Sequence, residues 1–277
     1  MNKFSHSCSI FSLMTSVAFT IGCADMTVVE NDANVVNKIL GGKNAQAPDW
    51  MVSLTLNDNF HCGGTLIHRD WVLTAAHCVD SAPKQNFKVC VGQTKRSKCA
   101  AADESSVKRI IRHGDFTRAN LLNGHDIALL KLKKSFNNRN LSPLAQPSNE
   151  PRTGQKVEAL GWGVSDYDSA NPNPNRLQRI KLPFISNTDC RLVYGSGLDN
   201  TLVCASAKGE TDEVADRSIC NGDSGGPIHF RGVQVGVASF VTINQFDRCT
   251  ANGANVFTRI SSFQNWIANK TGGDVRF

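Results

Sequence analysis

The chain is 277 residues long, which is enough to bury a sizeable core in one large or two ordinary domains. Its formal net charge of +6 is modest, and the densest basic patch, residues 95–98, lies between Cys90 and Cys99 without interleaved aromatic side chains. A solvated loop explains such a patch, so composition and charge argue against a nucleic-acid-binding protein.

The first residues indicate an export signal. Lys3 precedes an apolar run over residues 10–21 that is too short to span a membrane comfortably. Cleavage after Ala24 would remove residues 1–24 as a signal peptide and release a secreted protein, which is the favoured interpretation. Residues 20–23 also resemble an imperfect bacterial lipobox, and lipidation of Cys23 would instead give a periplasmic or outer-surface lipoprotein held at the membrane.

The cysteine count agrees with export. The chain has ten cysteines, and loss of Cys8 and Cys23 with the signal leaves an even number in an oxidising compartment, where disulfides are the default. No C-x-x-C pair occurs, which argues against a zinc ribbon. We therefore expect disulfides, no metal site and no cofactor.

Beyond the signal the chain changes character at a basic residue. Residues 25–38 are polar and without periodicity, as in a linker or propeptide. Short apolar alternations then recur between Gly, Asn and Pro turns, as at residues 51–56 and 233–237, and residues 127–132 are mostly apolar. Many short strands of this kind predict an antiparallel all-β sandwich or barrel.

Helical periodicity is confined to two places. Residues 186–189 can start a short helical turn, and Ser261 or Ser262 can cap a C-terminal helix whose apolar face begins at Phe263. Residues 165–176, rich in Asn, Asp and Pro, predict a long exposed loop.

The stretch Cys220–Pro227 (CNGDSGGP) places Ser224 between a carboxylate and two glycines. Consecutive glycines cost conformational entropy unless the backbone must approach something closely. A hydroxyl there can act as a nucleophile, and unobstructed backbone N–H groups can converge on an oxyanion as it develops. A surface turn is the alternative, because Gly, Asp and Ser are also turn residues.

A base and a residue to orient it are available elsewhere in the chain. His77 lies among small residues beside Cys78, and Asp126 opens the apolar strand at residues 127–132. An unpaired carboxylate at the head of a buried strand would be costly, and a neutral imidazole is a suitable partner for it.

Together these motifs resemble those of the chymotrypsin-family serine proteases, over residues 39–267. The order His, then Asp, then Ser is also the family's. The resemblance implies a serine endopeptidase built from two six-stranded antiparallel β-barrels with a C-terminal helix, with the protease domain at residues 39–270 and a short tail at 271–277. The motifs are ILGG at 39–42, TAAHC at 74–78, DIALL at 126–130, GWG at 161–163, GDSGGP at 222–227 and SF at 239–240.

The resemblance assigns a role to each site residue. Ser224 would attack the peptide carbonyl, His77 would take its proton and return it to the leaving amine, and Asp126 would hold the imidazole in the required tautomer. The backbone N–H groups of Gly222 and Ser224 would face the oxyanion. Ser239 lies where family members support the buried Asp with a hydrogen bond.

The resemblance also implies which cysteines pair. Cys62 would pair with Cys78 beside the catalytic His, Cys190 with Cys204, and Cys220 with Cys249 at the rim of the specificity pocket. Cys90 and Cys99 remain, and we expect them to pair across a small local loop, a bridge that the family pattern does not require.

A further implication is that the protein is made as a zymogen. Cleavage between Lys38 and Ile39 would create an α-amino group that folds inward and pairs with Asp223. That ion pair would order the backbone of residues 222–224, so that the oxyanion site exists only after cleavage.

Substrate choice in this family depends on a pocket beside the nucleophile. Its floor lies six positions before Ser224, where this chain has Ser218. Trypsin-like members need an Asp at the floor to neutralise a buried Lys or Arg of the substrate, so a neutral floor argues against that preference. Asp216 could substitute only through a shifted loop.

The expected pocket walls point to a shallow site. Along Ser239-Phe240-Val241, Val241 stands where open-pocketed members have Gly, and Asn255 stands at another wall position usually held by Gly. This pattern resembles the elastases and predicts cleavage after small or medium apolar residues. Aromatic preference, as in chymotrypsin, is the main alternative, and basic preference is the other.

The partners follow from these assignments. We expect protein or peptide substrates, an activating protease specific for basic residues, since a neutral pocket would not cleave after Lys38, and protein inhibitors. A monomer is expected, and contact with a membrane only if Cys23 carries a lipid. A catalytically silent homologue acting as a binding module is the competing interpretation, although the triad residues are all present.

Overall fold

The computed structural model describes residues 40–167, 173–208, 217–250 and 253–277. The expected signal peptide, the expected propeptide and the bond between Lys38 and Ile39 lie outside them. Contacts divide the chain into Met1–Val35 and Val36–Phe277, and every described residue belongs to the second unit. In the described part of the chain, no helix is both long enough and apolar enough to cross a membrane.

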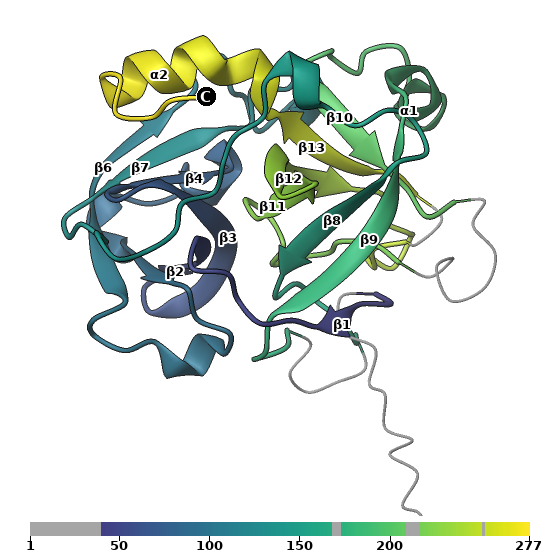
Figure 1. Ribbon diagram of the computed structural model, residues 1–277. Coiled ribbons are helices and arrows are strands. Elements are labelled where there is room, and N and C mark those ends of the chain that lie inside the picture. Colours follow the sequence, from purple (N-terminus) through teal and green to yellow (C-terminus); the bar gives the residue numbers. More distant parts are fainter. Residues whose placement is uncertain (1–39, 168–172, 209–216, 251–252) are drawn as a thin grey trace, which may run out of the picture. The chain divides into compact units, whose positions relative to one another are not determined.

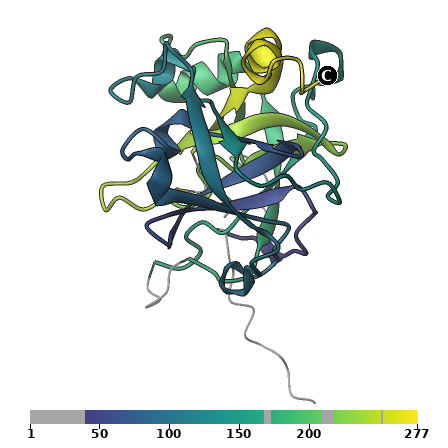
Figure 2. The same ribbon diagram turned by 90° about the vertical axis from the view of Figure 1, so that its left-hand side faces the viewer.

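Six antiparallel strands close the first barrel, in the order β2-β3-β4-β7-β6-β5. The colours of these six strands run from purple-blue to blue-green in Figure 1, and the strands face the viewer in Figure 2. The alternation predicted for residues 51–56 forms β2, where Val52 and Leu54 are buried inside the barrel with Leu66 and Leu73. The strands are Met51–Leu56 (β2), Asn59–His68 (β3), Trp71–Thr74 (β4), Phe87–Val91 (β5), Glu104–Arg112 (β6) and Ala128–Leu132 (β7).

The second barrel is also closed, because β8 pairs with both β9 and β11. Its core holds Ile180, Leu182 and Phe257, and a short strand, β1 (Lys43–Asn44), pairs with β9 from outside the ring. The six strands of the ring are Lys156–Gly161 (β8), Gln178–Ile185 (β9), Leu202–Ala205 (β10), Pro227–Phe230 (β11), Val233–Val241 (β12) and Asn255–Arg259 (β13). Two closed six-stranded barrels confirm the predicted fold class.

Two α-helices are described. α1 (Asn187–Tyr194) begins where a helical turn is predicted, and the hydroxyl of Ser186 caps it by accepting a hydrogen bond from the N–H of Asp189 at 3.0 Å. α2 (Gln264–Thr271) packs on the first barrel through Ile267. Short 3₁₀ segments cover Ala76–Cys78, Lys84–Asn86, Arg96–Lys98, Leu121–Asn123, Pro147–Asn149 and Ile260–Phe263.

The start of α2 differs from the prediction. Residues Ile260–Phe263 form a 3₁₀ turn, and neither Ser261 nor Ser262 caps the α-helix, which begins at Gln264. The hydroxyl of Ser261 donates a hydrogen bond to the carboxylate of Glu150 instead. The local sequence pattern predicts that this hydroxyl caps the helix, but in the structure it bonds to a residue that is 111 positions away in the sequence.

A backbone hydrogen bond joins the two barrels at Ser224. The N–H of Gly63 in β3 donates to the carbonyl oxygen of Ser224 at 2.8 Å. A Cβ on Gly63 would lie 2.9 Å from Cα of Gly226, which is closer than real Cβ contacts allow. The glycines on both sides of this contact let the strand of one barrel touch the loop of the other barrel that carries Ser224.

Candidate active site

Strand pairing in the first barrel brings His77 and Asp126 together. His77 lies in the 3₁₀ turn just after β4, and Asp126 lies just before β7. These two strands pair antiparallel, with Thr74 opposite Ala128, so the end of one is beside the start of the other. The disulfide between Cys62 and Cys78 ties the turn back to β3.

The carboxylate of Asp126 is completely buried and fully hydrogen-bonded. Its Oδ2 lies 2.7 Å from Nδ1 of His77 and accepts a 2.5 Å hydrogen bond from the hydroxyl of Ser239, while its Oδ1 accepts from the backbone N–H of His77 at 2.9 Å. The hydroxyl of Thr258 donates to the backbone carbonyl of Asp126 at 2.8 Å.

These contacts determine the charge on Asp126 and the tautomer of His77. Burial by itself would raise the pKa of Asp126, but the hydrogen bond and charge of His77, together with Ser239, lower it below its usual value. Because an ionised carboxylate only accepts hydrogen bonds, Nδ1 of His77 carries the proton and Nε2 keeps the lone pair. The imidazole is thereby prepared to act as a base.

The loop that carries Ser224 depends on two glycines with positive φ. Gly222 has φ 98° and Gly225 has φ 73°, a region that side-chain-bearing residues rarely adopt. Among hydrogen bonds between described residues, none is donated by the backbone N–H of Gly222 or Ser224. Two unpaired backbone donors at alternate positions, beside a half-buried serine hydroxyl, form a suitable site for an oxyanion.

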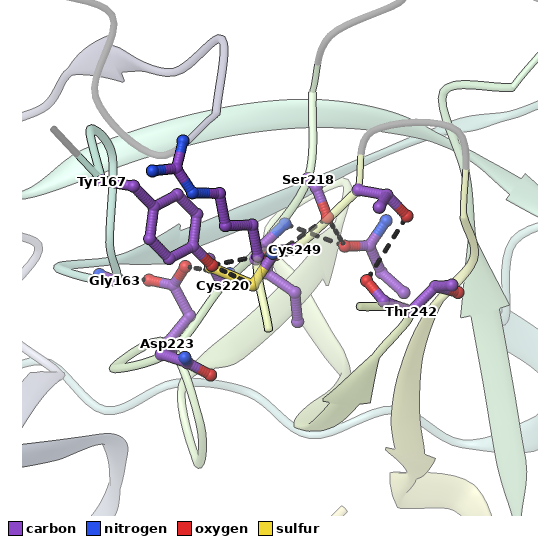
Figure 3. The surroundings of a disulfide bond; sticks show 12 residues. Gly163, Tyr167, Ser218, Cys220, Asp223, Thr242 and Cys249 are labelled. Carbon is purple, nitrogen blue, oxygen red and sulfur yellow. Dashed lines mark hydrogen bonds between the residues drawn. A yellow bond between two sulfur atoms is a disulfide. The ribbon is translucent and has the colours of Figure 1, made fainter. Parts of the chain in front are cut away.

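The carboxylate of Asp223 lies in a cradle of backbone N–H groups, which Figure 3 shows beside Gly163. Its Oδ1 accepts from the N–H of Gly163 at 2.7 Å and its Oδ2 from the N–H of Cys220 at 2.9 Å. A Cβ on Gly161 or Gly163 would lie 2.0 or 2.2 Å from a carboxylate oxygen of Asp223, so only glycine leaves room there. The GWG motif thus has a function that the sequence did not suggest.

No cationic side chain of the described residues pairs with Asp223. Complete burial raises its pKa to about 7, and the two backbone hydrogen bonds lower it only in part. The group is therefore a buried acid that a nearby cation would ionise.

A cavity of about 170 Å³ opens beside Ser224. The expected pocket residues Ser239, Phe240 and Val241 line it, together with Ala238 and Ile243. None of its lining residues is acidic, and Asp216 lies outside the described residues.

Two expected pocket residues lie behind the lining instead. The hydroxyl of Ser218, which is 1% exposed, donates to Oδ1 of Asn255 and to the carbonyl of Ile219, both at 2.8 Å. Asn255 is completely buried, accepts from the N–H of Ile219 at 2.8 Å and donates to the carbonyl of Ala205 at 3.0 Å. The sequence predicts Asn255 as bulk in a wall, whereas the structure uses its amide to hold the segment beneath the pocket.

All eight cysteines expected to form disulfides do so. The pairs are Cys62–Cys78, Cys90–Cys99, Cys190–Cys204 and Cys220–Cys249. At the last of them, Tyr167 lies over the bridge in Figure 3, and its hydroxyl is 2.8 Å from Sγ of Cys220 and accepts from the N–H of Cys249 at 2.7 Å. Nothing in the sequence pattern distinguishes this tyrosine from other loop residues.

Comparison with known proteins agrees with this geometry. The family model described as Trypsin matches residues 39–267. Brachyurin of Leptuca pugilator is 31% identical over 84% of this chain and 99% of its own length. Chymotrypsin-like elastase family member 1 of Rattus norvegicus is 33% identical over 84% of this chain and 89% of its own length.

A solved structure shows the same fold. Neuropsin, described as a serine protease expressed in the limbic system of mouse brain, superposes with a TM-score of 0.69 at 29% sequence identity. The match covers 83% of this chain and 98% of that chain.

Proposed function

Because the chain belongs to the trypsin family and is a serine endopeptidase, we propose that it is a secreted zymogen that, once cleaved after Lys38, cuts substrates after small or medium apolar residues. The observation that carries this proposal is a cavity of about 170 Å³ beside Ser224 whose described lining residues carry no charge. The hydrogen bonds of Asp126 to His77 and Ser239, and the unpaired N–H groups of Gly222 and Ser224 among the described residues, support an active enzyme over a catalytically silent homologue.

The proposed mechanism uses each group in turn. Nε2 of His77 removes the proton from the hydroxyl of Ser224, whose oxygen attacks the substrate carbonyl carbon. The N–H groups of Gly222 and Ser224 stabilise the resulting oxyanion, and His77 then gives its proton to the leaving amine, which leaves an acyl-enzyme. Water, activated by the same imidazole, releases the acyl group. Asp126 stays ionised and stabilises the imidazolium throughout.

The size and polarity of the cavity support the apolar preference. A volume of about 170 Å³ is below the roughly 300–1,000 Å³ of pockets for whole small-molecule ligands and suits a single side chain. Val241 and Ile243 present apolar surface to it, and Ser218 beneath it has its hydroxyl hydrogen in use. Among the described residues that line the cavity, a buried Lys or Arg of the substrate would meet no charged partner, which is very unfavourable.

A panel of chromogenic peptides that differ only in the residue before the cut tests this preference. We expect kcat/KM to be highest for Ala, Val or Leu, lower for Phe and lowest for Arg. Fast turnover of Arg or Lys peptides with none of Ala or Val would contradict the proposal, and a clear maximum at Phe would establish the aromatic alternative.

The surroundings of Leu40 support activation at Lys38–Ile39. The carbonyl of Leu40 accepts from the N–H of Ser218 at 3.2 Å, and its side chain packs with Val164 and Cys220. Cys220 donates a backbone hydrogen bond to Asp223. The residue that follows the proposed new N-terminus is therefore packed beside the cradle of the carboxylate that the new ammonium would neutralise.

A Lys38→Gln variant tests the activation step, with cleavage of the wild-type precursor by an added basic-specific protease as the reference. We expect the wild type to gain activity on cleavage and the variant to remain uncut at this bond and nearly inactive. Full activity in the uncut chain would contradict activation at this bond. Maturation of the purified precursor without added protease would contradict the need for a separate activator.

Four disulfides support export to an oxidising, extracellular environment. We propose removal of residues 1–24, release as a monomer, and control by protein inhibitors. The comparisons give no support to the bacterial lipoprotein alternative. Mass spectrometry of the mature N-terminus, which should read Ile39, tests export and activation together, and a lipidated Cys23 at the N-terminus would contradict release.

A further inference from the structure

Three titratable side chains outside the catalytic triad lie close together in the segment that joins β6 to β7. They are His113, Asp115 and His125, and one candidate ligand atom from each lies within 4.8 Å of the others. From the sequence we expect no metal site, since it has no C-x-x-C pair; these three residues, up to twelve positions apart, come together only in the fold.

Two other clusters of His, Cys, Asp or Glu occur among the described residues, and both are already satisfied. In the first, Cys62 and Cys78 form a disulfide and have no free thiolate for a metal. In the second, Asp70 and Asp274 are paired with Lys131, whose Nζ lies 2.7 Å and 3.5 Å from them. In the cluster of His113, Asp115 and His125, by contrast, no disulfide and no lysine of the described residues occupies a ligand atom.

The hydrogen bonds leave a lone pair on each imidazole. Nδ1 of His125 lies 2.8 Å from the backbone carbonyl oxygen of Asn123, and since a carbonyl only accepts, Nδ1 carries the hydrogen and Nε2 the lone pair. A backbone carbonyl on the far nitrogen is the usual support for a metal-binding histidine. Nδ1 of His113 accepts a long hydrogen bond of 3.3 Å from the N–H of Asp115, so the lone pair of this imidazole lies on Nδ1, and a metal ion would replace that hydrogen bond.

Aromatic side chains of the C-terminal segment hold the two imidazoles in position. The ring of His113 packs 5.2 Å from Phe263 and 5.1 Å from Trp266, and the ring of His125 packs 5.7 Å from Phe263. The backbone N–H of His113 donates to the carbonyl of Ile127 at 3.0 Å. Both ligands are thus preorganised before any ion binds, as a binding site requires.

Asp115 provides the adjustable third ligand. Its side chain is 76% exposed, with Oδ2 3.9 Å from Nδ1 of His113, and its charge is opposite to that of an incoming cation. Ligands around a tetrahedral zinc ion are about 3.4 Å apart, given bonds of roughly 2.0–2.1 Å. The distances between the ligand atoms therefore have to shorten slightly when the ion binds, and the exposed carboxylate of Asp115 is free to move towards the imidazoles.

We propose that His113, Asp115 and His125 bind one divalent transition-metal ion, for which Zn²⁺ is the best match. Two imidazoles and one carboxylate suit zinc, with water in the fourth position, and do not suit the all-oxygen preference of Ca²⁺ or Mg²⁺. Because His125 directly precedes Asp126, the ion would bind next to a residue of the triad without using any of the triad's side chains.

Calorimetric titration of Zn²⁺ into the full chain tests the proposal, with Ser224→Ala in every protein to prevent self-digestion. We expect one ion per chain. His113→Gln, His125→Asn and Asp115→Asn should each weaken binding by about tenfold or more, since even loss of an outer partner of a ligand costs about 10–100-fold. Asn is chosen for position 125 because it tolerates the φ of 63° found there.

Two control variants separate this site from other histidines. His68→Gln removes a surface histidine of a satisfied cluster, and His77→Ala removes the triad imidazole, and both should bind Zn²⁺ like the parent. Thermal unfolding without metal shows whether each variant is folded. If a histidine variant does not fold, Asp115→Asn, at an exposed position, still tests the site. The proposal is overturned if the parent binds no Zn²⁺, if the three ligand variants bind it unchanged, or if His77→Ala abolishes binding.

Discussion

Asp126 and Asp223 belong to the same candidate active site and are both buried, at 0% and 2% exposure, yet their pKa values move in opposite directions. The pKa of Asp126 is lowered, because an imidazole and a hydroxyl outweigh the effect of burial. The pKa of Asp223 is raised to about 7, because burial acts against only two backbone hydrogen bonds. Burial alone therefore does not determine the charge of a carboxylate; its partners do.

The difference matches the proposed roles of the two groups. Strand pairing between β4 and β7 gives Asp126 its partner within the folded barrel. Asp223 has hydrogen-bond donors but no cation among the described residues, and its cradle adjoins the packing site of Leu40. Folding therefore gives Asp126 its partner, whereas in our proposal Asp223 gains one only when cleavage releases the amino group of Ile39.

Asp126→Asn should show the largest effect. The amide cannot supply a full negative charge and disturbs the tautomer of His77, so kcat should fall by about 10⁴-fold, the size of this loss in serine proteases of this type. Steady-state kinetics on the preferred peptide measures it, with Asp58→Asn, at an exposed carboxylate, as the control. A loss of less than tenfold would show that Asp126 does not orient the base.

Asp223→Asn should have a smaller effect through a different step. The neutral side chain cannot pair with the new ammonium, so the backbone of residues 222–224 would be poorly ordered and kcat would fall by about 10²–10³-fold, the cost of losing an oxyanion donor. Reaction of Ser224 with a fluorophosphonate should slow in parallel. Unchanged activity in the cleaved variant would show that Asp223 has no part in activation.

Gly163→Ala should have the smallest of the three effects. The new methyl group would lie 2.2 Å from Oδ2 of Asp223 and must displace it, at a cost of about 1–3 kcal/mol, typical of overpacking in a core. Thermal unfolding measures the loss, and Gly197→Ala is the matched control because nothing lies within 4 Å of its Cβ. Equal stability of the two variants would show that Asp223 does not need the space that Gly163 leaves.

The sequence predicts the parts of the site that are encoded locally. Each residue of the triad lies within its own short motif, as do the strand alternation and the glycine loop, and the fold class follows from the family that these motifs resemble. Asn255 and Ser261 behave differently, because their side chains bond to residues 36 and 111 positions away. Such partners are set by tertiary packing, and the same holds for the room that Gly161 and Gly163 leave for Asp223. The metal site proposed at His113, Asp115 and His125 likewise depends on tertiary packing.

The pH dependence of stability follows from the raised pKa of Asp223. The unfolded chain would titrate near 3.8 and the folded, uncut chain near 7. The folded state therefore binds more protons between these values, and the stability contributed by protonated Asp223 is fully present below about pH 4 and is lost as pH rises to 7. Pairing with an ammonium would remove this dependence.

Titration of Asp223 by ¹³C NMR tests the central claim most directly, in the full chain carrying Ser224→Ala, before and after cleavage at Lys38 by an added protease. Asp223→Asn identifies the signal. We expect a pKa of about 7 in the uncut chain and a shift to or below the ordinary value for a carboxyl after cleavage, as the ammonium of Ile39 stabilises the charge. The same pKa before and after cleavage would contradict the account.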